Sequence, residues 1–144
     1  MLKVIKMAGT SQELYQCVAP LVMNPDILKY NHNYPFKTSE SFIWFVAFYE
    51  KKVLGFFPVE VRKKTIVINN YYVENDDESV FAGLLEAVID EFQDTNKILE
   101  AVVQKIHESF FSVQNFEIER MWSTYLKMRM KNEKKLKMGK MCMS

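Results

Sequence analysis

The sequence predicts an α/β or α+β domain built on one mixed sheet that helices cover. Three apolar runs, 42–49, 53–61 and 65–73, are joined by short polar turns, and turns of this length connect antiparallel neighbours. An amphipathic helix follows at 77–92, and a further strand follows at 98–104. A strand–helix–strand unit of this kind forms a right-handed parallel crossover, so the sheet is expected to be mixed.

The residues before this sheet are predicted to form a strand and two helices. Residues 2–7 alternate apolar and polar side chains, which is typical of a half-buried strand. Thr10 or Ser11 can cap a helix that ends near Val22, because either hydroxyl can accept a backbone N–H. Pro25 suits the first turn of a second, short helix, where a missing N–H costs no hydrogen bond.

The helix at 77–92 and the segments after it complete the predicted sheet. The apolar residues of this helix recur at spacings of three and four, and they are Val80, Phe81, Leu84, Leu85, Val88, Ile89 and Phe92. The stretch 106–114 predicts a short helix. The stretch 116–130 is strand-like but has no Gly or Pro to place a turn, which leaves open one long bent strand or a tight pair.

Composition limits the classes of partner. The chain has 19 basic and 18 acidic residues, so no global charge selects nucleic acid or a membrane surface. Its length fits one domain, which we place at 1–130, followed by a basic tail at 131–144 that we expect to be disordered. No apolar run approaches the ~18 residues of a membrane span. We therefore expect no membrane partner and no specific nucleic acid partner.

The N-terminal residues and the cysteines favour a cytoplasmic protein. Lys3 and Lys6 interrupt the first apolar run, which does not fit a signal peptide. Cys17 falls in a predicted helix and Cys142 falls in the tail, so we expect no disulfide between them.

Several catalytic and metal-binding motifs are absent from the sequence. There is no CxxC, HExxH, GxSxG or GxxxxGK[ST] pattern, and the only histidines are His32 and His107. A structural zinc site and a serine-hydrolase triad are therefore unsupported, and we predict no metal site.

Four stretches and the order of the elements resemble the GNAT family of N-acetyltransferases over about residues 2–130. The stretches are "VAFYEKKVLGFFPVEV", "INNYYVENDDESVFAGLLEAVIDEF", "LEAVVQKIHESFFSVQNFEIE" and "YLKMRMK". The resemblance implies a mostly antiparallel sheet with one parallel crossover and helices on both faces. It also implies acyl transfer from acetyl-CoA to a small-molecule or peptide amine.

The strand-to-helix joint departs from the family pattern. In GNAT proteins this joint reads (Arg/Gln)-x-x-Gly-x-(Gly/Ala), and its backbone N–H groups hold the pyrophosphate of coenzyme A. Here it reads D-D-E-S-V-F, with Asp76, Ser79 and Phe81 at the three defining positions. A like-charge contact at ~4 Å costs about 4 kcal/mol at an intermediate dielectric, so these carboxylates oppose an anion. As an alternative, acidic residues in a first turn cap the helix and complement its dipole.

The next strand-to-helix unit departs as well. The resemblance places Gln104 where the family has Asn, His107 where it has Ala, and Phe111 where a Tyr often protonates the departing thiolate. Phe111 cannot donate a proton, so an acid would have to come from another group or from water. Asn115 stands where the family has Gly at the helix end, and Asn tolerates that left-handed conformation.

The resemblance, together with the polar end of the 65–73 strand, gives a set of candidate site residues. The expected catalytic residues are Asn70, Tyr72 and Glu60. The residues expected to bind the cofactor are Tyr71, Val73, Ser79, Val80, Phe81, Ala82, Gln104 and Phe111. The residues expected to form the substrate pocket are Tyr30, His32, Tyr34 and Asn69.

Each of these assignments has a plainer alternative. Alternation puts Asn69 and Tyr71 on one face of the strand, but the polar run can also be a strand end that reaches solvent. Glu60 can be a solvated strand glutamate, and the aromatic segment around His32 can simply pack on the sheet. We expect His107 to lie at the surface.

The sequence thus leaves two main functional hypotheses. The first is an acyl-CoA-dependent N-acyltransferase of GNAT type that uses acetyl-CoA. The second is a catalytically inactive GNAT-like binding or interaction domain that has lost normal coenzyme A binding. A third, weaker hypothesis is nonspecific nucleic acid contact through the lysines of the tail. A homodimer is a further arrangement that the sequence leaves open.

Overall fold

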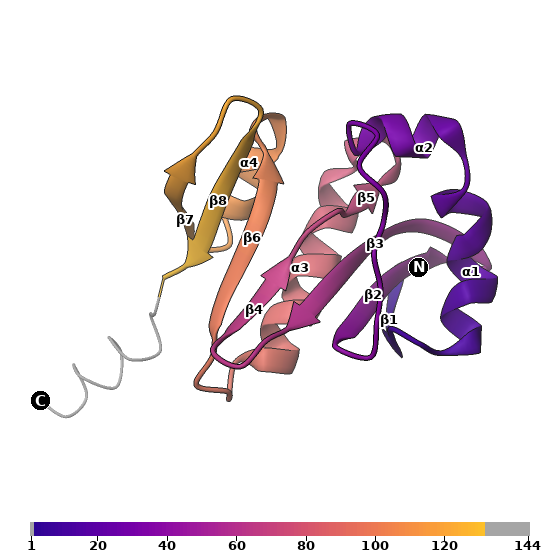
Figure 1. Ribbon diagram of the computed structural model, residues 1–144, viewed down its shortest axis with the longest axis horizontal. Helices are drawn as coiled ribbons and strands as arrows, with labels where there is room; N and C mark the ends of the chain where they lie inside the picture. Colours follow the sequence, from indigo (N-terminus) through magenta and orange to yellow (C-terminus); the bar gives the residue numbers. More distant parts are fainter. Residues whose placement is uncertain (1, 132–144) are drawn as a thin grey trace, which may run out of the picture.

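The computed structural model describes residues 2–131, which form an eight-stranded sheet with helices on both faces (Figure 1). The strands are β1 (Leu2–Ala8), β2 (Phe42–Tyr49), β3 (Lys52–Val61), β4 (Thr65–Ile68), β5 (Tyr72–Val73), β6 (Ile98–Gln104), β7 (Phe116–Met121) and β8 (Tyr125–Met130). The α-helices are α1 (Gln12–Val22), α2 (Pro25–Tyr30), α3 (Glu78–Phe92) and α4 (Glu108–Ser112). Two 3-10 turns, η1 (Glu74–Asp76) and η2 (Lys105–His107), precede α3 and α4.

The sheet is mixed, as predicted. Its strand order is β1-β2-β3-β4-β6-β8-β7, and β5 pairs with β3 beside β4. Only β4 and β6 are parallel, with Thr65 opposite Ile98 and Ile68 opposite Ala101, and α3 provides the crossover between them. β6 continues to Gln104, three residues past its last partner on β4. The two strands therefore separate at this end, and the candidate site lies there.

The predicted strand at 65–73 is wrong in one respect, because the chain leaves the ladder between Ile68 and Tyr72. Asn70 has a φ of 56°, a left-handed conformation that Asn tolerates better than most residues. The predicted alternation fails across this break. Tyr71 points into the main core, whereas Tyr72 packs on the opposite side of the sheet.

Each face of the sheet carries its own apolar core. On one face α3 and α4 bury the main core, in which Phe57, Phe81 and Phe111 are almost fully covered. On the other face α1 packs Leu14 and Val18 against β1, β2 and β3. In Figure 1, α1 and α2 lie beside β1–β3, and no described helix lies in front of β6 and β8. That uncovered part of the sheet borders the candidate site.

Local sequence signals account for the helix starts. The Ser11 hydroxyl accepts a hydrogen bond from Leu14 N at 3.1 Å and caps α1. Asn24 Oδ1 accepts from Asp26 N at 2.9 Å and caps α2, with Pro25 at its first position. At the C-terminal end, the open choice for 116–130 is decided in favour of a tight pair, β7 and β8.

Two further predictions concern the ends of the chain and membranes. The predicted tail, residues 131–144, lies outside the described residues except for Lys131. Among residues 2–131, no helix is both long and apolar enough to cross a bilayer.

Gly55 makes room for β5, and a side chain there should destabilise the fold. A Cβ at Gly55 would lie 2.6 Å from the carbonyl oxygen of Tyr72, a backbone atom that cannot turn aside. We expect Gly55→Ala to lower the free energy of unfolding by about 1–3 kcal/mol, measured by urea denaturation.

Gly83→Ala is the matched control for this measurement. Its Cβ would meet side-chain methyl groups, Leu2 Cδ2 at 2.9 Å and Val4 Cγ2 at 3.8 Å, and Ala favours a helix over Gly by ~1 kcal/mol. We expect its stability to stay near or above that of the wild type. Equal stability of both variants would contradict the role given to Gly55.

Candidate functional site

The candidate site has two sides, one on each face of the sheet, at the end where β4 and β6 separate. On the α3 face lies the joint between β5 and α3, which we call the α3 joint (residues 73–82). On the opposite face lies a groove of about 520 Å³, which we call the front groove. Its floor includes Asn69, Asn70 and Val102, and its walls are residues 122–125 on one side and, on the other, His32, Tyr34, Pro35 and Lys37.

Asp77 occupies the first amides of α3. One of its carboxylate oxygens, Oδ1, accepts hydrogen bonds from Ser79 N at 2.9 Å, from Ser79 Oγ at 2.6 Å and from Val80 N at 3.3 Å. The hydrogen bond from the Ser79 hydroxyl, together with those from the two amides, holds the pKa of Asp77 below its usual range. The carboxylate therefore stays charged and acts as the N-cap of the helix.

Asp76 turns away from the helix and joins a chain of polar side chains. Its Oδ1 accepts from the Tyr30 hydroxyl at 2.7 Å and lies 2.9 Å from His107 Nε2. Asn75 and Asp76 both have positive φ, 57° and 49°, which lets the short η1 turn aim Asp76 at α2 and η2. This contact joins three segments that are distant in sequence.

The chain continues from His107 to the backbone of β6. His107 Nδ1 lies 2.7 Å from the hydroxyl of Tyr71, and that oxygen accepts from Gln104 N at 2.9 Å. Because the Tyr71 oxygen receives the amide proton, its own proton points to Nδ1, and Nε2 carries the hydrogen that Asp76 accepts. Burial lowers the pKa of His107, although Asp76 opposes the shift, which agrees with a neutral ring. Burial also raises the pKa of Tyr71 and keeps its hydroxyl protonated.

The expectation that His107 lies at the surface is wrong. Its side chain is about 1% exposed and lies 5.0 Å, centroid to centroid, from Phe81. Phe110 and Phe111 follow His107 by three and four residues, so all three can share the inner face of one helical turn. That spacing was the signal for a buried histidine.

Aromatic rings fill the space behind the α3 joint. Phe81 stacks on Phe110 with ring centroids 4.5 Å apart, and it is 1% exposed. Phe111 stacks on Phe57 at 6.0 Å and is fully buried. Of the other residues expected to bind a cofactor, Val73 and Val80 are also buried, whereas Ser79 is exposed and Ala82 is half-buried.

The three expected catalytic residues do not come together. Glu60 accepts from Arg62 at 2.8 Å on the outer part of β3 and does not line the front groove. Tyr72 packs on Phe56 and on the edge of Tyr30 in the second core. Asn70 alone lies in the groove floor.

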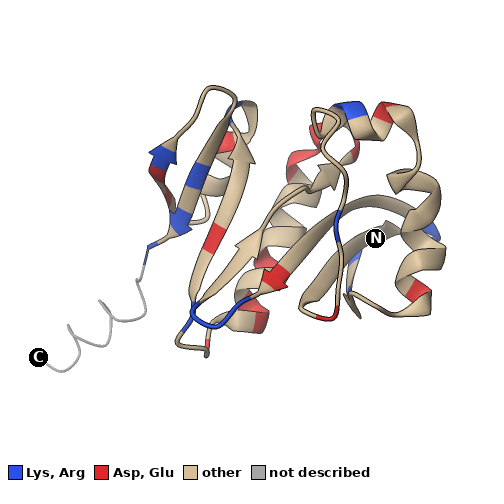
Figure 2. Cartoon of the chain, in the orientation of Figure 1, with Lys and Arg blue, Asp and Glu red and all other residues tan. Residues whose placement is uncertain are grey.

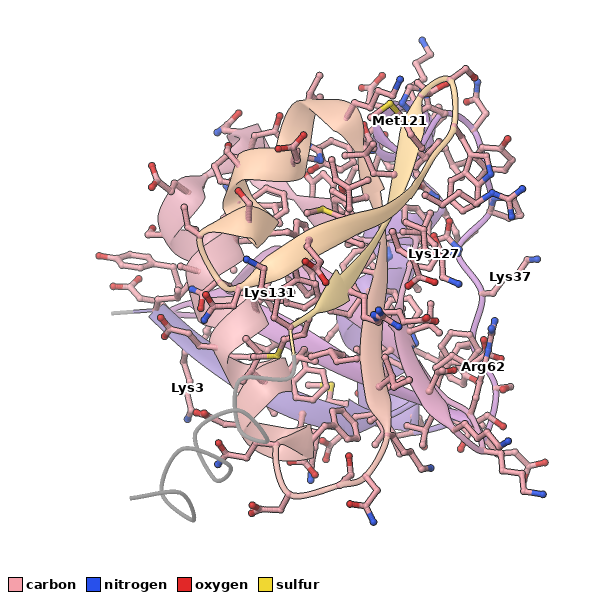
Figure 3. The ribbon with its side chains drawn as sticks, turned by 90° about the vertical axis from the view of Figure 1, so that its left-hand side faces the viewer. Lys3, Lys37, Arg62, Met121, Lys127 and Lys131 are labelled. Atoms are coloured by element: carbon pink, nitrogen blue, oxygen red, sulfur yellow. The ribbon has the colours of Figure 1, made fainter. Side chains whose placement is uncertain are left out.

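The expected substrate pocket is largely brought together. His32, Tyr34 and Asn69 line the front groove, and His32 Nε2 lies 3.3 Å from Gln104 Oε1. Tyr30 lies instead in the polar chain behind the groove. In Figure 3, Lys37 lies on the same side of the molecule as Lys127 of β8, the side that faces the viewer in Figure 1.

One wall of the groove was not foreseen. Residues 122–125, Trp-Ser-Thr-Tyr, comprise the turn between β7 and β8 and the first residue of β8, and they close the groove opposite the segment that holds His32, Tyr34 and Lys37. Aromatic and hydroxyl side chains together in a short turn were a signal for a binding surface, but the turn itself could not be placed without Gly or Pro.

Comparison with solved structures identifies the fold. ElaA from Escherichia coli matches with a TM-score of 0.69 and 12% identity, over 91% of this chain and 100% of that one. The PaiA N-acetyltransferase from Thermoplasma acidophilum, in complex with coenzyme A, matches with 0.62 and 11% identity over 91% and 99%. The N-acetyltransferase PseH from Campylobacter jejuni, in complex with acetyl coenzyme A, matches with 0.59 and 15% identity over 92% and 99%.

The chain has the GNAT fold. Identities of 11–15% establish the fold alone. No protein-family model matches the sequence, and no curated protein matches it either. Because one fold can carry many functions, the function of this chain depends on the residues of its site.

Relative to the GNAT pattern, the two sides of the site differ. The front groove is open at the position where the resemblance implies an acceptor pocket. At the α3 joint, where the resemblance implies coenzyme A, Ser79 and Phe81 stand at the two glycine positions. The Asp77 carboxylate accepts hydrogen bonds from Ser79 N and Val80 N there, and the Phe81 ring stacks on Phe110.

The buried neutral histidine should make stability depend on pH. In the unfolded chain His107 takes up a proton near pH 6.5, whereas the folded state resists protonation. The contribution of His107 to the free energy of unfolding should therefore be constant above about pH 6.5 and fall below it, by up to about 1.4 kcal/mol per pH unit. His107→Gln should remove this component, measured by urea denaturation between about pH 7.5 and pH 5.

His32→Gln is the control, because it removes the other histidine from the groove wall and leaves the polar chain in place. An unchanged pH slope in His107→Gln would contradict the neutral state assigned to His107.

Proposed function

We propose that this protein is a GNAT-fold binding domain that takes a small ligand in the front groove and does not hold coenzyme A at the α3 joint. The observation that carries this proposal is the capping of α3 by Asp77, whose carboxylate occupies the amides of Ser79 and Val80. A pyrophosphate would need those same N–H groups.

Electrostatics support the proposal. Displacing Asp77 would break three hydrogen bonds to a carboxylate that is charged at neutral pH. The displaced charge and the incoming phosphate would then lie close together, beside Glu74 and Glu78. Figure 2 shows acidic residues gathered where β5 leads into α3. Like charges ~4 Å apart repel by about 1–4 kcal/mol, depending on how strongly solvent and salt screen them.

Packing also supports it. Glycine at the position of Phe81 would let a ligand approach the backbone, but the Phe81 ring packs against both His107 and Phe110, with centroids 5.0 Å and 4.5 Å away. Removing a buried ring of this size costs roughly 3–5 kcal/mol, so the ring is a structural part of this core. Phe111, at the position of the family's proton-donating Tyr, has no hydroxyl and is fully buried.

Acyl-CoA-dependent N-acyl transfer is the second candidate function. It is favoured by the likeness to PaiA solved with coenzyme A and to PseH solved with acetyl coenzyme A. For this candidate function, the Asp77 carboxylate would have to leave the amides of Ser79 and Val80, and the neighbouring η1 turn with Asp76 would have to move, before acetyl-CoA could reach α3. Asn70 at the groove floor and a water molecule would then be the groups left for catalysis among the expected catalytic residues, because Glu60 and Tyr72 do not line the groove.

Calorimetry with acetyl-CoA and with coenzyme A tests the proposal. We expect no binding at millimolar ligand, because the α3 amides are occupied and the neighbouring charge is negative. Ligand at a hundred times its dissociation constant would raise the free energy of unfolding by about 2.7 kcal/mol, and we expect no such rise in a thermal unfolding experiment.

Asp77→Asn provides the matched variant. It keeps an oxygen on Ser79 N and Val80 N but removes the charge, so the amides stay occupied and binding should remain absent. Saturable binding of acetyl-CoA to the wild type, with acetyl transfer to an amine, would overturn the proposal in favour of the second candidate.

A further inference from the structure

We propose that the front groove binds a small anion that combines a planar ring with a carboxylate, and that it rejects protonated amines. This inference rests on the proposed function, because it names the class of ligand for that groove. The groove presents hydrogen-bond donors, a positive charge and accessible aromatic rings.

The floor of the groove presents amide donors. Asn31 Nδ2 donates to the carbonyl oxygen of Tyr34 at 3.0 Å, which fixes the orientation of the Asn31 amide. The same nitrogen donates to Asn70 at 2.9 Å, so the Asn70 atom that faces it must be Oδ1. Asn70 Nδ2 makes no hydrogen bond within residues 2–131 and remains a donor.

Asn69 adds a second donor by the same reasoning. Its Oδ1 accepts from Asn70 N at 2.8 Å, which again fixes the amide orientation. Asn69 Nδ2 has no partner in the described part of the chain. Both acceptor oxygens of this pair are thus used by the protein, and both NH₂ groups are left for a ligand.

The groove wall presents a third donor that lacks a partner. The hydroxyl of Tyr125 is buried and has no hydrogen-bond partner among residues 2–131. Burial raises the pKa of Tyr125, so the hydroxyl is protonated at neutral pH and can donate. A buried polar group without a partner is rare in folded proteins, and a bound acceptor would satisfy it.

The charge of the lining has one sign. Lys37 is the cation in the described wall, and no Asp or Glu is among the described residues that line the groove. A carboxylate would gain charge-assisted hydrogen bonds from these donors, which are stronger than neutral ones. An ammonium group would find no carboxylate among these lining residues to balance its charge, and it would lie near Lys37 and the two amide NH₂ groups.

The remaining wall is aromatic and accessible. Tyr34 is 58% exposed and Trp122 is 40% exposed, which leaves ring surface for a ligand. Tyr125 contacts Tyr34 and His32 edge-on, with centroids 6.2 Å and 5.4 Å apart. Aromatic side chains in this arrangement bind planar rings by stacking and edge contacts.

Three probes that share a phenyl ring and a two-carbon linker test the inference: 3-phenylpropionate, 3-phenylpropionamide and 2-phenylethylamine. They carry negative, neutral and positive end groups at the pH of the experiment. In an NMR titration we expect 3-phenylpropionate to bind at least about tenfold more tightly than the amide, and the amine not to bind. Backbone shifts should concentrate at Asn69, Asn70 and residues 122–125.

Asn69→Asp is the decisive variant. The new carboxylate can still accept from Asn70 N, but it replaces the free amide donor by a second negative oxygen. We expect it to abolish binding of 3-phenylpropionate. Asn96→Asp adds the same charge in the exposed turn between α3 and β6, away from the groove lining, and should bind like the wild type.

Three results would overturn the inference: equal binding of the acid and the amine, retained binding in Asn69→Asp, or binding of none of the probes at millimolar concentration. None of these results depends on the α3 joint. The acetyl-CoA measurement tests the proposed function separately, so failure of the ligand class and failure of that proposal can be told apart.

Discussion

One hydrogen-bonded chain of side chains joins the segments that meet where β4 and β6 separate. It runs from Tyr30 of α2 through Asp76 and His107 to Tyr71, and it ends on the backbone N–H of Gln104. β4 ends at Ile68, so it offers no ladder partner to the last residues of β6. The Tyr71 hydroxyl replaces that partner, which avoids a buried amide without a hydrogen bond. The separation of the strands is thus stabilised by side chains of this protein.

The left-handed turn at Asn70 is the backbone feature that makes this chain possible. It ends β4 early and directs Tyr71 to the α3 face, while the side chains of Asn69 and Asn70 stay at the floor of the front groove. A continuous strand through these residues would have put Asn69 and Tyr71 on the same face. Because of the break, the side-chain amides of Asn69 and Asn70 lie in a solvent-accessible groove and the Tyr71 side chain lies in the core. That division explains why one side of the site is open and the other is filled.

Much of the fold could be predicted from periodicity and turn chemistry, because these are local signals. The boundaries of β2 and β6 coincide with the predicted runs 42–49 and 98–104, and the crossover at α3 was expected from the order of elements. The break at Asn70 could not be predicted, since Val-Ile-Asn-Asn-Tyr-Tyr fits a strand as well as a turn. The burial of His107 was missed because its partners, Tyr71 and Asp76, are 36 and 31 residues away in sequence.

In the candidate site, a residue's type alone indicated its role only where its chemistry allows a single conclusion. Phe111 has no hydroxyl proton to donate wherever it lies, so its departure from the family pattern could be interpreted without a structure. By contrast, a run of acidic residues in the sequence does not indicate which groups each carboxylate contacts. Consecutive residues Asp76 and Asp77 point to different partners, one to the polar chain and one to the α3 amides, and only the φ values of η1 separate them. The roles of these two residues therefore required tertiary contacts.

Gln104 connects the groove to the chain, and this link constrains how either side can change. Its Nε2 donates to the carbonyl oxygen of Tyr30 at 2.8 Å, and its Oε1 lies 3.3 Å from His32 in the groove wall. Its backbone N–H is the end of the polar chain itself. Moving Asp76 to admit a phosphate would release Tyr30, and Tyr30 also holds the Gln104 side chain that faces His32. An opening of the α3 joint would thus disturb the groove wall, so the filled joint helps to keep the open groove in shape.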